Sequence, residues 1–96
     1  MELRIKFKDY ECFLNIGKYS NGRVALELID TEDCCPVATA SVNIPDVSLA
    51  NDEILIKSWS ENEGMADLLM NLKVIGPELE KVSTGFVYAT VHKLLI

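Results

Sequence analysis

The chain has 96 residues, of which 49% are hydrophobic and 25% are charged, and its formal net charge is −6. This length and composition predict one ordinary globular domain over residues 1–96, and they exclude collagenous, low-complexity and wholly disordered classes. The charge is uneven, because residues 24–80 contain 2 basic and 12 acidic side chains, whereas residues 1–23 contain 5 basic and 3 acidic ones. The acidic middle disfavours direct binding to nucleic acid or to an anionic membrane, and it favours a basic protein partner.

The apolar pattern indicates the cellular compartment. Residues 1–8 alternate charged with apolar side chains, and no apolar run approaches the length that crosses a bilayer. We therefore expect a cytoplasmic protein in which Cys12, Cys34 and Cys35 stay reduced. Adjacent Cys34 and Cys35 would form a strained ring, and no C-x-x-C spacing offers a zinc site, so we interpret this pair as part of a turn.

Alternating side chains predict three strands in the first third of the chain. Alternation over residues 3–7 is typical of a half-buried strand, and further strands are expected over residues 12–19 and 24–28. Between the last two, residues 20–23 are Ser-Asn-Gly-Arg, and Asn-Gly favours a type I′ turn. These residues therefore predict a tight hairpin.

The middle of the chain predicts a turn followed by another strand. Polar residues 31–36 end in Pro36, which lacks an amide donor, so they should turn the chain into a strand over residues 37–43. The small side chains of Ala38 and Ala40 on this strand would let a helix approach the sheet closely. Further strands are expected over residues 54–57 and 86–91.

A single helix is predicted over about residues 60–72. Ser60 and Glu63 have the spacing of a capping box, in which each side chain accepts a hydrogen bond from the other residue's amide. Gly76-Pro77 should end the segment, since Gly suits the left-handed position after a helix and Pro cannot continue it. The apolar stripe expected to pack on the sheet consists of Met65, Leu68, Leu69 and Leu72. The elements together predict an α+β fold, with a twisted, mainly antiparallel sheet of five or six strands and the helix on one face.

The sequence contains no recognisable catalytic or ligand-binding motif. His92 is the only histidine, and we expect it to be a partly exposed strand residue without a role, although a Cys-His or Ser-His arrangement stays open. The carboxylates lack aromatic neighbours that would raise a pKa, so we interpret them as solvated. Neither the calcium-loop spacing nor a glycine-rich phosphate loop occurs. We therefore expect no enzyme activity, no cofactor and no metal site.

The densest polar and aromatic patch surrounds Trp59, within residues 57–65. An exposed Trp flanked by charged side chains is typical of a binding hot spot. The alternative is structural, with Trp59 folded over the first helical turn as a hydrophobic staple against Met65.

Four segments carry a family resemblance, namely residues 22–30, 38–46, 56–65 and 84–87. They resemble a family of small, function-unassigned proteins carried by bacterial plasmids, conjugative elements and phages. The similarity covers about residues 17–91 and is most specific in the Ser-Glu-Asn-Glu-Gly-Met run. The resemblance implies a setting on mobile DNA and transfers no catalytic residue.

Small acidic proteins in that setting are often inhibitors that occupy the basic nucleic-acid channel of a host defence nuclease. We therefore expect a non-enzymatic interaction protein that presents carboxylates where phosphates would lie. The candidate partner-binding residues are Trp59, Glu61, Glu63, Asp67, Asp30, Glu32 and Asp33. Two alternatives stay open: a structural or regulatory module that binds protein through a neutral surface around Trp59, and a net charge that only keeps the protein soluble.

Overall fold

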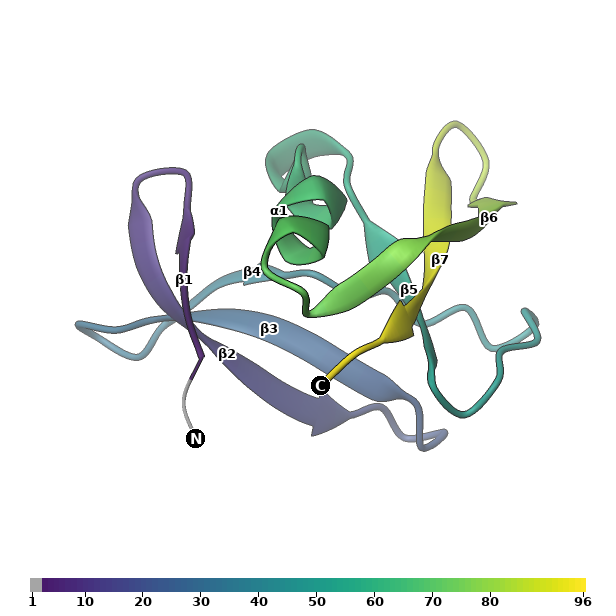
Figure 1. Ribbon diagram of the computed structural model, residues 1–96, viewed down its shortest axis with the longest axis horizontal. Coiled ribbons are helices and arrows are strands. Elements are labelled where there is room, and N and C mark those ends of the chain that lie inside the picture. Colours follow the sequence, from purple (N-terminus) through teal and green to yellow (C-terminus); the bar gives the residue numbers. More distant parts are fainter. Residues whose placement is uncertain (1–2) are drawn as a thin grey trace.

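Seven strands in the described part of the chain form two antiparallel sheets (Figure 1). The computed structural model describes residues 3–96. The first sheet is a meander in the order β1-β2-β3-β4. Its strands are β1 (Arg4–Phe7), β2 (Tyr10–Lys18), β3 (Val24–Asp30) and β4 (Pro36–Thr39).

The second sheet has the order β5-β7-β6, and two short helices lie in the connection between β5 and β6. Its elements are β5 (Glu53–Lys57), η1 (Ser60–Asn62), α1 (Met65–Asn71), β6 (Ile75–Ser83) and β7 (Tyr88–Leu94). The α+β class is confirmed, but the prediction of one sheet with five or six strands is wrong. No helix within residues 3–96 is long and apolar enough to cross a membrane.

The predicted strand over residues 37–43 divides between the two sheets. Its first half forms β4, which pairs with β3. The Ala40 amide then donates to the Leu26 oxygen of β3 at 2.8 Å, while the Ala40 oxygen accepts from the Lys57 amide of β5 at 3.0 Å. One extended segment therefore passes from the first sheet to the second, and side-chain alternation alone does not reveal this division.

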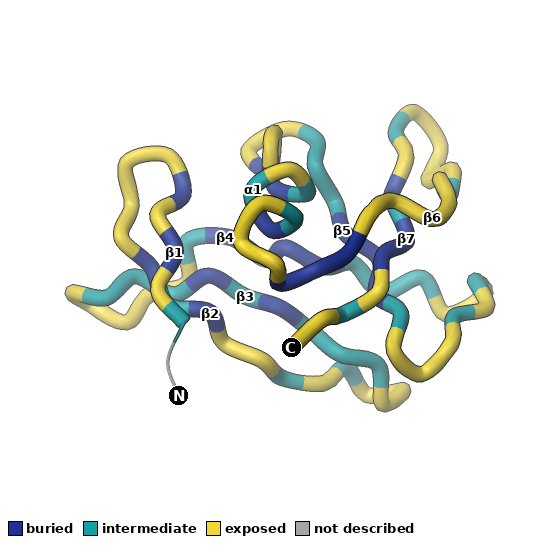
Figure 2. Tube along the Cα trace, viewed as in Figure 1, coloured by how far each residue is buried: buried dark blue, intermediate teal, exposed yellow. Residues whose placement is uncertain are grey.

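The main core lies where the two sheets and α1 meet (Figure 2). From α1 it contains Met65 and Leu69, both 0% exposed, and burial of such side chains contributes roughly 1.5–3 kcal/mol each. Ala38 and Ala40 lie in the same core, but α1 packs mainly on β5 and β6 rather than on β4. Leu72 is 40% exposed, so the apolar stripe is shorter than predicted.

A smaller second core covers the other face of the three-stranded sheet. It contains Leu55, Ala89 and Val91, which are packed against Val42, Ile44, Val47, Leu49, Trp59 and Val82. β5 is therefore buried on both faces, because Ile54 and Ile56 belong to the main core while Leu55 belongs to the second. A continuous apolar run, rather than an alternating one, is typical of a strand buried on both sides.

The helix begins at Met65, and the predicted capping box at Ser60 is wrong. Ser60 has a φ of +56°, whereas a capping residue needs an extended backbone. The Ser58 hydroxyl instead accepts a hydrogen bond from the Ala66 amide at 3.0 Å. The cap of α1 therefore comes from the segment before η1.

Asn62 explains why the chain forms η1 where the capping box was expected. It is 3% exposed, and its side-chain amide donates to the Thr39 oxygen at 2.7 Å and to the Lys57 oxygen at 3.3 Å. These bonds hold η1 against β4 and β5. Leaving a buried amide unpaired costs about 1–3 kcal/mol, whereas a capping side chain contributes about 1 kcal/mol, so the Asn62 bonds prevail.

α1 ends in a Schellman motif, and the predicted end at Gly76-Pro77 is wrong. The Val74 amide donates to the Leu69 oxygen at 3.0 Å, and the Lys73 amide donates to the Met70 oxygen at 3.1 Å. Lys73 occupies the left-handed position with a φ of +61°. The glycine and the proline lie inside β6, a strand that the sequence did not indicate.

The predicted hairpin joins β2 and β3, but its turn is not type I′. Gly22 has a φ of +87°, whereas Asn21 is outside the left-handed region that a type I′ turn also requires of it. The Gly22 amide donates to the Tyr19 oxygen at 2.9 Å. Residues 19–22 therefore form a four-residue turn whose last residue is a left-handed glycine. This arrangement is typical of hairpins whose loop has three residues.

Candidate functional site

The first group of predicted acidic residues forms the turn between β3 and β4. Asp30 accepts a hydrogen bond from the Glu32 amide at 2.8 Å, and Asp33 accepts one from the Cys35 amide at 3.0 Å. Aspartates commonly fold turns in this way. Glu32 and Asp33 are nevertheless exposed, so their charge faces solvent.

Pairing of β2 with β3 extends this acidic group. A hollow of about 280 Å³ is lined by Asp9, Tyr10, Glu11, Asp30, Thr31 and Glu32. The Thr31 amide and hydroxyl both donate to the Glu11 oxygen, at 3.0 and 3.2 Å, and fix the two strand ends together. No basic side chain lines the hollow, and Tyr10 is 50% exposed at its edge.

Asp9, Tyr10 and Glu11 were not among the candidates from the sequence. The hairpin register offers a signal for one of them, because the pairs run from Lys18↔Val24 to Cys12↔Asp30. If this register is continued by one more pair, away from the turn, Glu11 lies opposite Thr31. The contributions of Asp9 and Tyr10 depend on how the neighbouring turn folds.

The second predicted group lies at the helix entry. Glu61, Glu63 and Asp67 are all exposed, and within residues 3–96 none of their carboxylates forms an ion pair. The Lys8 ammonium, in the turn between β1 and β2, donates to the main-chain oxygen of Glu61 at 2.7 Å. This contact joins the β1–β2 turn to η1.

The β1–β2 turn therefore links the two predicted acidic groups. Asp9 and Tyr10 directly follow Lys8, which contacts η1, and both also line the hollow beside the β3–β4 turn. We call the combined set the acidic surface. It consists of Asp9, Glu11, Asp30, Glu32, Asp33, Glu61, Glu63 and Asp67.

The cysteines show the effect of this negative charge. The Asp33 carboxylate is the main cause that raises the pKa of the exposed Cys35. Burial raises the pKa of Cys12, and the charges of Asp30 and Glu11 add to the shift. All three cysteines are free thiols. A raised pKa leaves less thiolate at neutral pH, so neither Cys12 nor Cys35 has the environment of an activated nucleophile.

Trp59 lies away from the residue that was expected to contact it. Its side chain is half-buried against the second core, whereas Met65 belongs to the main core. The predicted staple between Trp59 and Met65 is therefore wrong. The patch around Trp59 also divides, because the chain bends at η1 between Trp59 and α1.

His92 is fully buried in β7, and the expectation of a partly exposed strand histidine is wrong. Its Nδ1 atom lies 2.8 Å from the Gly76 oxygen and its Nε2 atom lies 2.7 Å from the Thr90 hydroxyl. A carbonyl oxygen only accepts, so Nδ1 donates, and in the neutral ring Nε2 accepts from Thr90. His92 thus satisfies both ring nitrogens within the fold and joins β6 to β7.

Residues 3–96 contain no group of three or more His, Cys, Asp or Glu side chains arranged to hold a metal ion.

No protein-family model, curated protein or solved structure matches the chain. The geometry of the acidic surface is consequently the basis of the functional proposal.

Proposed function

We propose that this protein is a non-enzymatic interaction protein that binds a basic partner through the acidic surface. One observation carries the proposal: three segments that are distant in sequence bring carboxylates to neighbouring turns and to the start of α1, and none of these carboxylates forms an ion pair within residues 3–96. Unpaired carboxylates close together repel one another, and a cationic partner relieves this repulsion.

We further propose that the partner is a basic nucleic-acid-binding enzyme, and specifically a host defence nuclease that the protein inhibits. Carboxylates spread over several turns can contact the Lys and Arg side chains that would otherwise bind phosphates. The resemblance to proteins of plasmids, conjugative elements and phages supports a mobile genetic element as the setting. The net charge of −6 supports electrostatic attraction to such a channel.

The neutral surface around Trp59 is the weaker proposal for the binding site. Trp59 is half-buried against Leu55, Ala89 and Val91, so much of its ring surface is already used inside the fold. A hot-spot Trp contributes through surface that is exposed in the free protein and buried in the complex. The acidic side chains, in contrast, are mostly exposed.

The experiment compares two triple variants of equal charge. The first is Glu61→Gln, Glu63→Gln and Asp67→Asn, within the acidic surface. The control is Asp46→Asn, Glu78→Gln and Glu80→Gln, which removes three exposed carboxylates elsewhere. Each protein is immobilised, exposed to bacterial lysate at low and high salt, and the retained proteins are identified and tested for nuclease activity.

We expect the unaltered protein and the control to retain the same basic nuclease at low salt and to inhibit it. The variant of the acidic surface should bind it about tenfold more weakly, because surface charges act mainly through attraction and orientation. Equal retention by both triple variants would contradict the role of the acidic surface. Retention that high salt does not weaken would contradict the electrostatic basis.

A further inference from the structure

Residues 43–49 cross the outer face of the three-stranded sheet without forming a strand or a helix. We call this segment the strap. Its side chains Ile44, Val47 and Leu49 pack on the second core, over Leu55 and its neighbours. Within the described residues, the strap makes no backbone hydrogen bond to the sheet it covers. Its Val47 amide donates to the Ile44 oxygen, which belongs to the strap itself.

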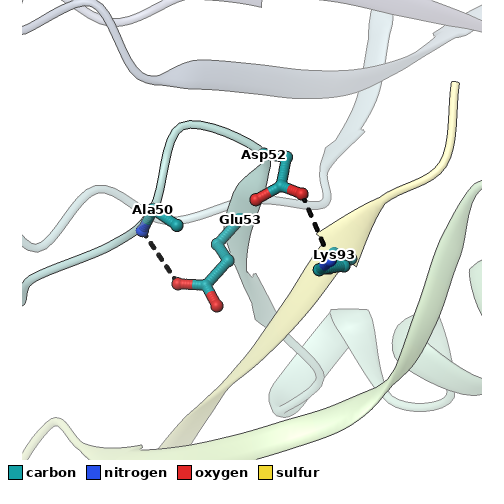
Figure 3. Close-up of polar contacts among 4 residues, drawn as sticks. All are labelled: Ala50, Asp52, Glu53 and Lys93. Carbon is teal, nitrogen blue, oxygen red and sulfur yellow. Dashed lines mark hydrogen bonds and ion pairs between the residues drawn. The ribbon is translucent and has the colours of Figure 1, made fainter.

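Both ends of the strap are fixed. Before it, the Val42 amide donates to the Leu55 oxygen at 3.1 Å. After it, the Ala50 amide donates to Glu53 Oε1 at 2.8 Å, and Asp52 forms an ion pair with Lys93 at 3.5 Å (Figure 3). Motion of the strap is therefore confined to the residues between these two anchors.

Arg23 holds the middle of the strap. Its guanidinium donates to the Ile44 oxygen at 2.8 Å and also to the Val47 oxygen. One planar group thus binds two carbonyls of the strap, a geometry that a lysine ammonium does not reproduce. Within residues 3–96, the only other hydrogen bond between the strap and the rest of the fold comes from the neighbouring Asn21 side chain, which donates to Asn43 at 3.1 Å.

We propose that Arg23 is a latch, and that the strap opens as a local unit and uncovers an apolar face formed by Leu55, Ala89, Val91 and Trp59. Segments with few backbone hydrogen bonds to the rest of a protein open with a smaller free energy than the strands they cover. The strap meets this condition, because side chains of the β2–β3 turn supply its polar contacts. The proposal is independent of the acidic surface, since none of the eight acidic residues contacts the strap in the hydrogen bonds described above.

Trp59 supplies a specific signal for opening. It is the single Trp of the chain and it borders the second core, so its fluorescence quenching by acrylamide reports how often this core is uncovered. The Val47 amide donates to Ile44 within the strap, so its hydrogen exchange reports loosening of the strap backbone, and Trp59 quenching reports whether the strap leaves the second core. The amides of β3 serve as the reference for global unfolding.

In the unaltered protein we expect the Val47 amide to exchange through local opening, so its exchange rate should change little at low denaturant concentrations. The β3 amides should exchange through global unfolding, so their rates should rise with denaturant. In Arg23→Lys we expect the Val47 exchange rate to rise about tenfold and Trp59 quenching to increase, with β3 exchange unchanged. Lys18→Gln is the control, because Lys18 is an exposed cation at the end of β2 that adjoins the β2–β3 turn.

Two results would overturn the latch. One is exchange of Val47 and of β3 with the same denaturant dependence in the unaltered protein, because the strap would then open only when the whole fold opens. The other is an Arg23→Lys variant whose Val47 exchange rate and Trp59 quenching equal those of the unaltered protein. The first result needs no variant, so a folding defect of Arg23→Lys does not affect it.

Discussion

The Lys8 ammonium donates a hydrogen bond to the main-chain oxygen of Glu61 at 2.7 Å, although the two residues are 53 positions apart in the chain. Lys8 has a left-handed φ of +55°, and its ammonium also lies 5.3 Å from the Phe7 ring centre. The contact fixes the β1–β2 turn beside the helix entry. It thereby places the β1–β2 turn, with Asp9 directly after Lys8, next to η1, which contains Glu61.

Removal of this contact should lower the free energy of unfolding. Lys8→Met keeps a long apolar stem but has no donor, and we expect a loss of about 0.5–1 kcal/mol, since the bond is exposed to solvent. Lys6→Met is the control, because Lys6 is an exposed residue of β1 whose side chain forms no hydrogen bond or ion pair in the described structure. Urea unfolding of both variants measures the difference, and equal stabilities would show that the contact contributes nothing.

The cap of α1 can be assigned by a pair of serine variants. Ser58→Ala removes the hydroxyl that accepts from the Ala66 amide and should cost about 0.5–2 kcal/mol. Ser60→Ala should leave stability nearly unchanged, because the Ser60 side chain caps no amide. Thermal unfolding distinguishes the two. A larger loss for Ser60→Ala would restore the capping box that the sequence predicted.

Replacement of Lys73 by glycine should raise the free energy of unfolding. It occupies the left-handed position of the Schellman motif with a φ of +61°, where a side chain costs about 1–2 kcal/mol. Lys73→Gly removes this cost but adds freedom to the unfolded chain, so a net gain of about 0.5–1 kcal/mol is expected. Lys73→Ala keeps the Cβ atom and should give no gain. If chemical denaturation gave Lys73→Gly a lower free energy of unfolding than the unaltered protein, the strain at Lys73 would be contradicted.

The acidic surroundings of Cys35 predict a pH dependence of its reactivity. Because Asp33 raises the pKa of Cys35, less thiolate is present at neutral pH and alkylation is slower than for an ordinary exposed thiol. In a Cys34→Ser background, Asp33→Asn should shift the pH profile of iodoacetamide alkylation to lower pH and speed the reaction at pH 7. An unchanged profile would show that Asp33 does not control the thiol. Cys12 should react slowly in every variant, because it is buried.

Local patterns in the sequence predicted elements whose signals lie within one segment. Alternation located β1 and β3, and the strand expected over residues 54–57 corresponds to β5. The last predicted strand overlaps β7, which lies over Tyr88–Leu94 rather than 86–91. Asp67 is exposed on α1, as its helical spacing from the buried Met65 and Leu69 predicts. These features depend on neighbours along the chain.

Features that depend on distant contacts were missed. Gly76 and Pro77 have the composition of a helix end, yet pairing with β7 and the His92 bond to the Gly76 oxygen place them in a strand. The capping box was lost because Asn62 binds Thr39, 23 positions away. No local pattern indicates that Lys8 contacts Glu61. Six of the eight residues of the acidic surface could therefore be predicted, whereas Asp9, Glu11 and the arrangement of the set could not.

The most direct test of the acidic surface is the salt dependence of the dissociation constant for the identified basic partner, measured by titration calorimetry from about 50 mM to about 300 mM salt. We expect binding to weaken steadily as salt increases, and we expect Glu61→Gln, Glu63→Gln and Asp67→Asn together to reduce both the affinity and the steepness of this dependence. A dissociation constant that is independent of salt, or a triple variant with the same dependence as the unaltered protein, would contradict it.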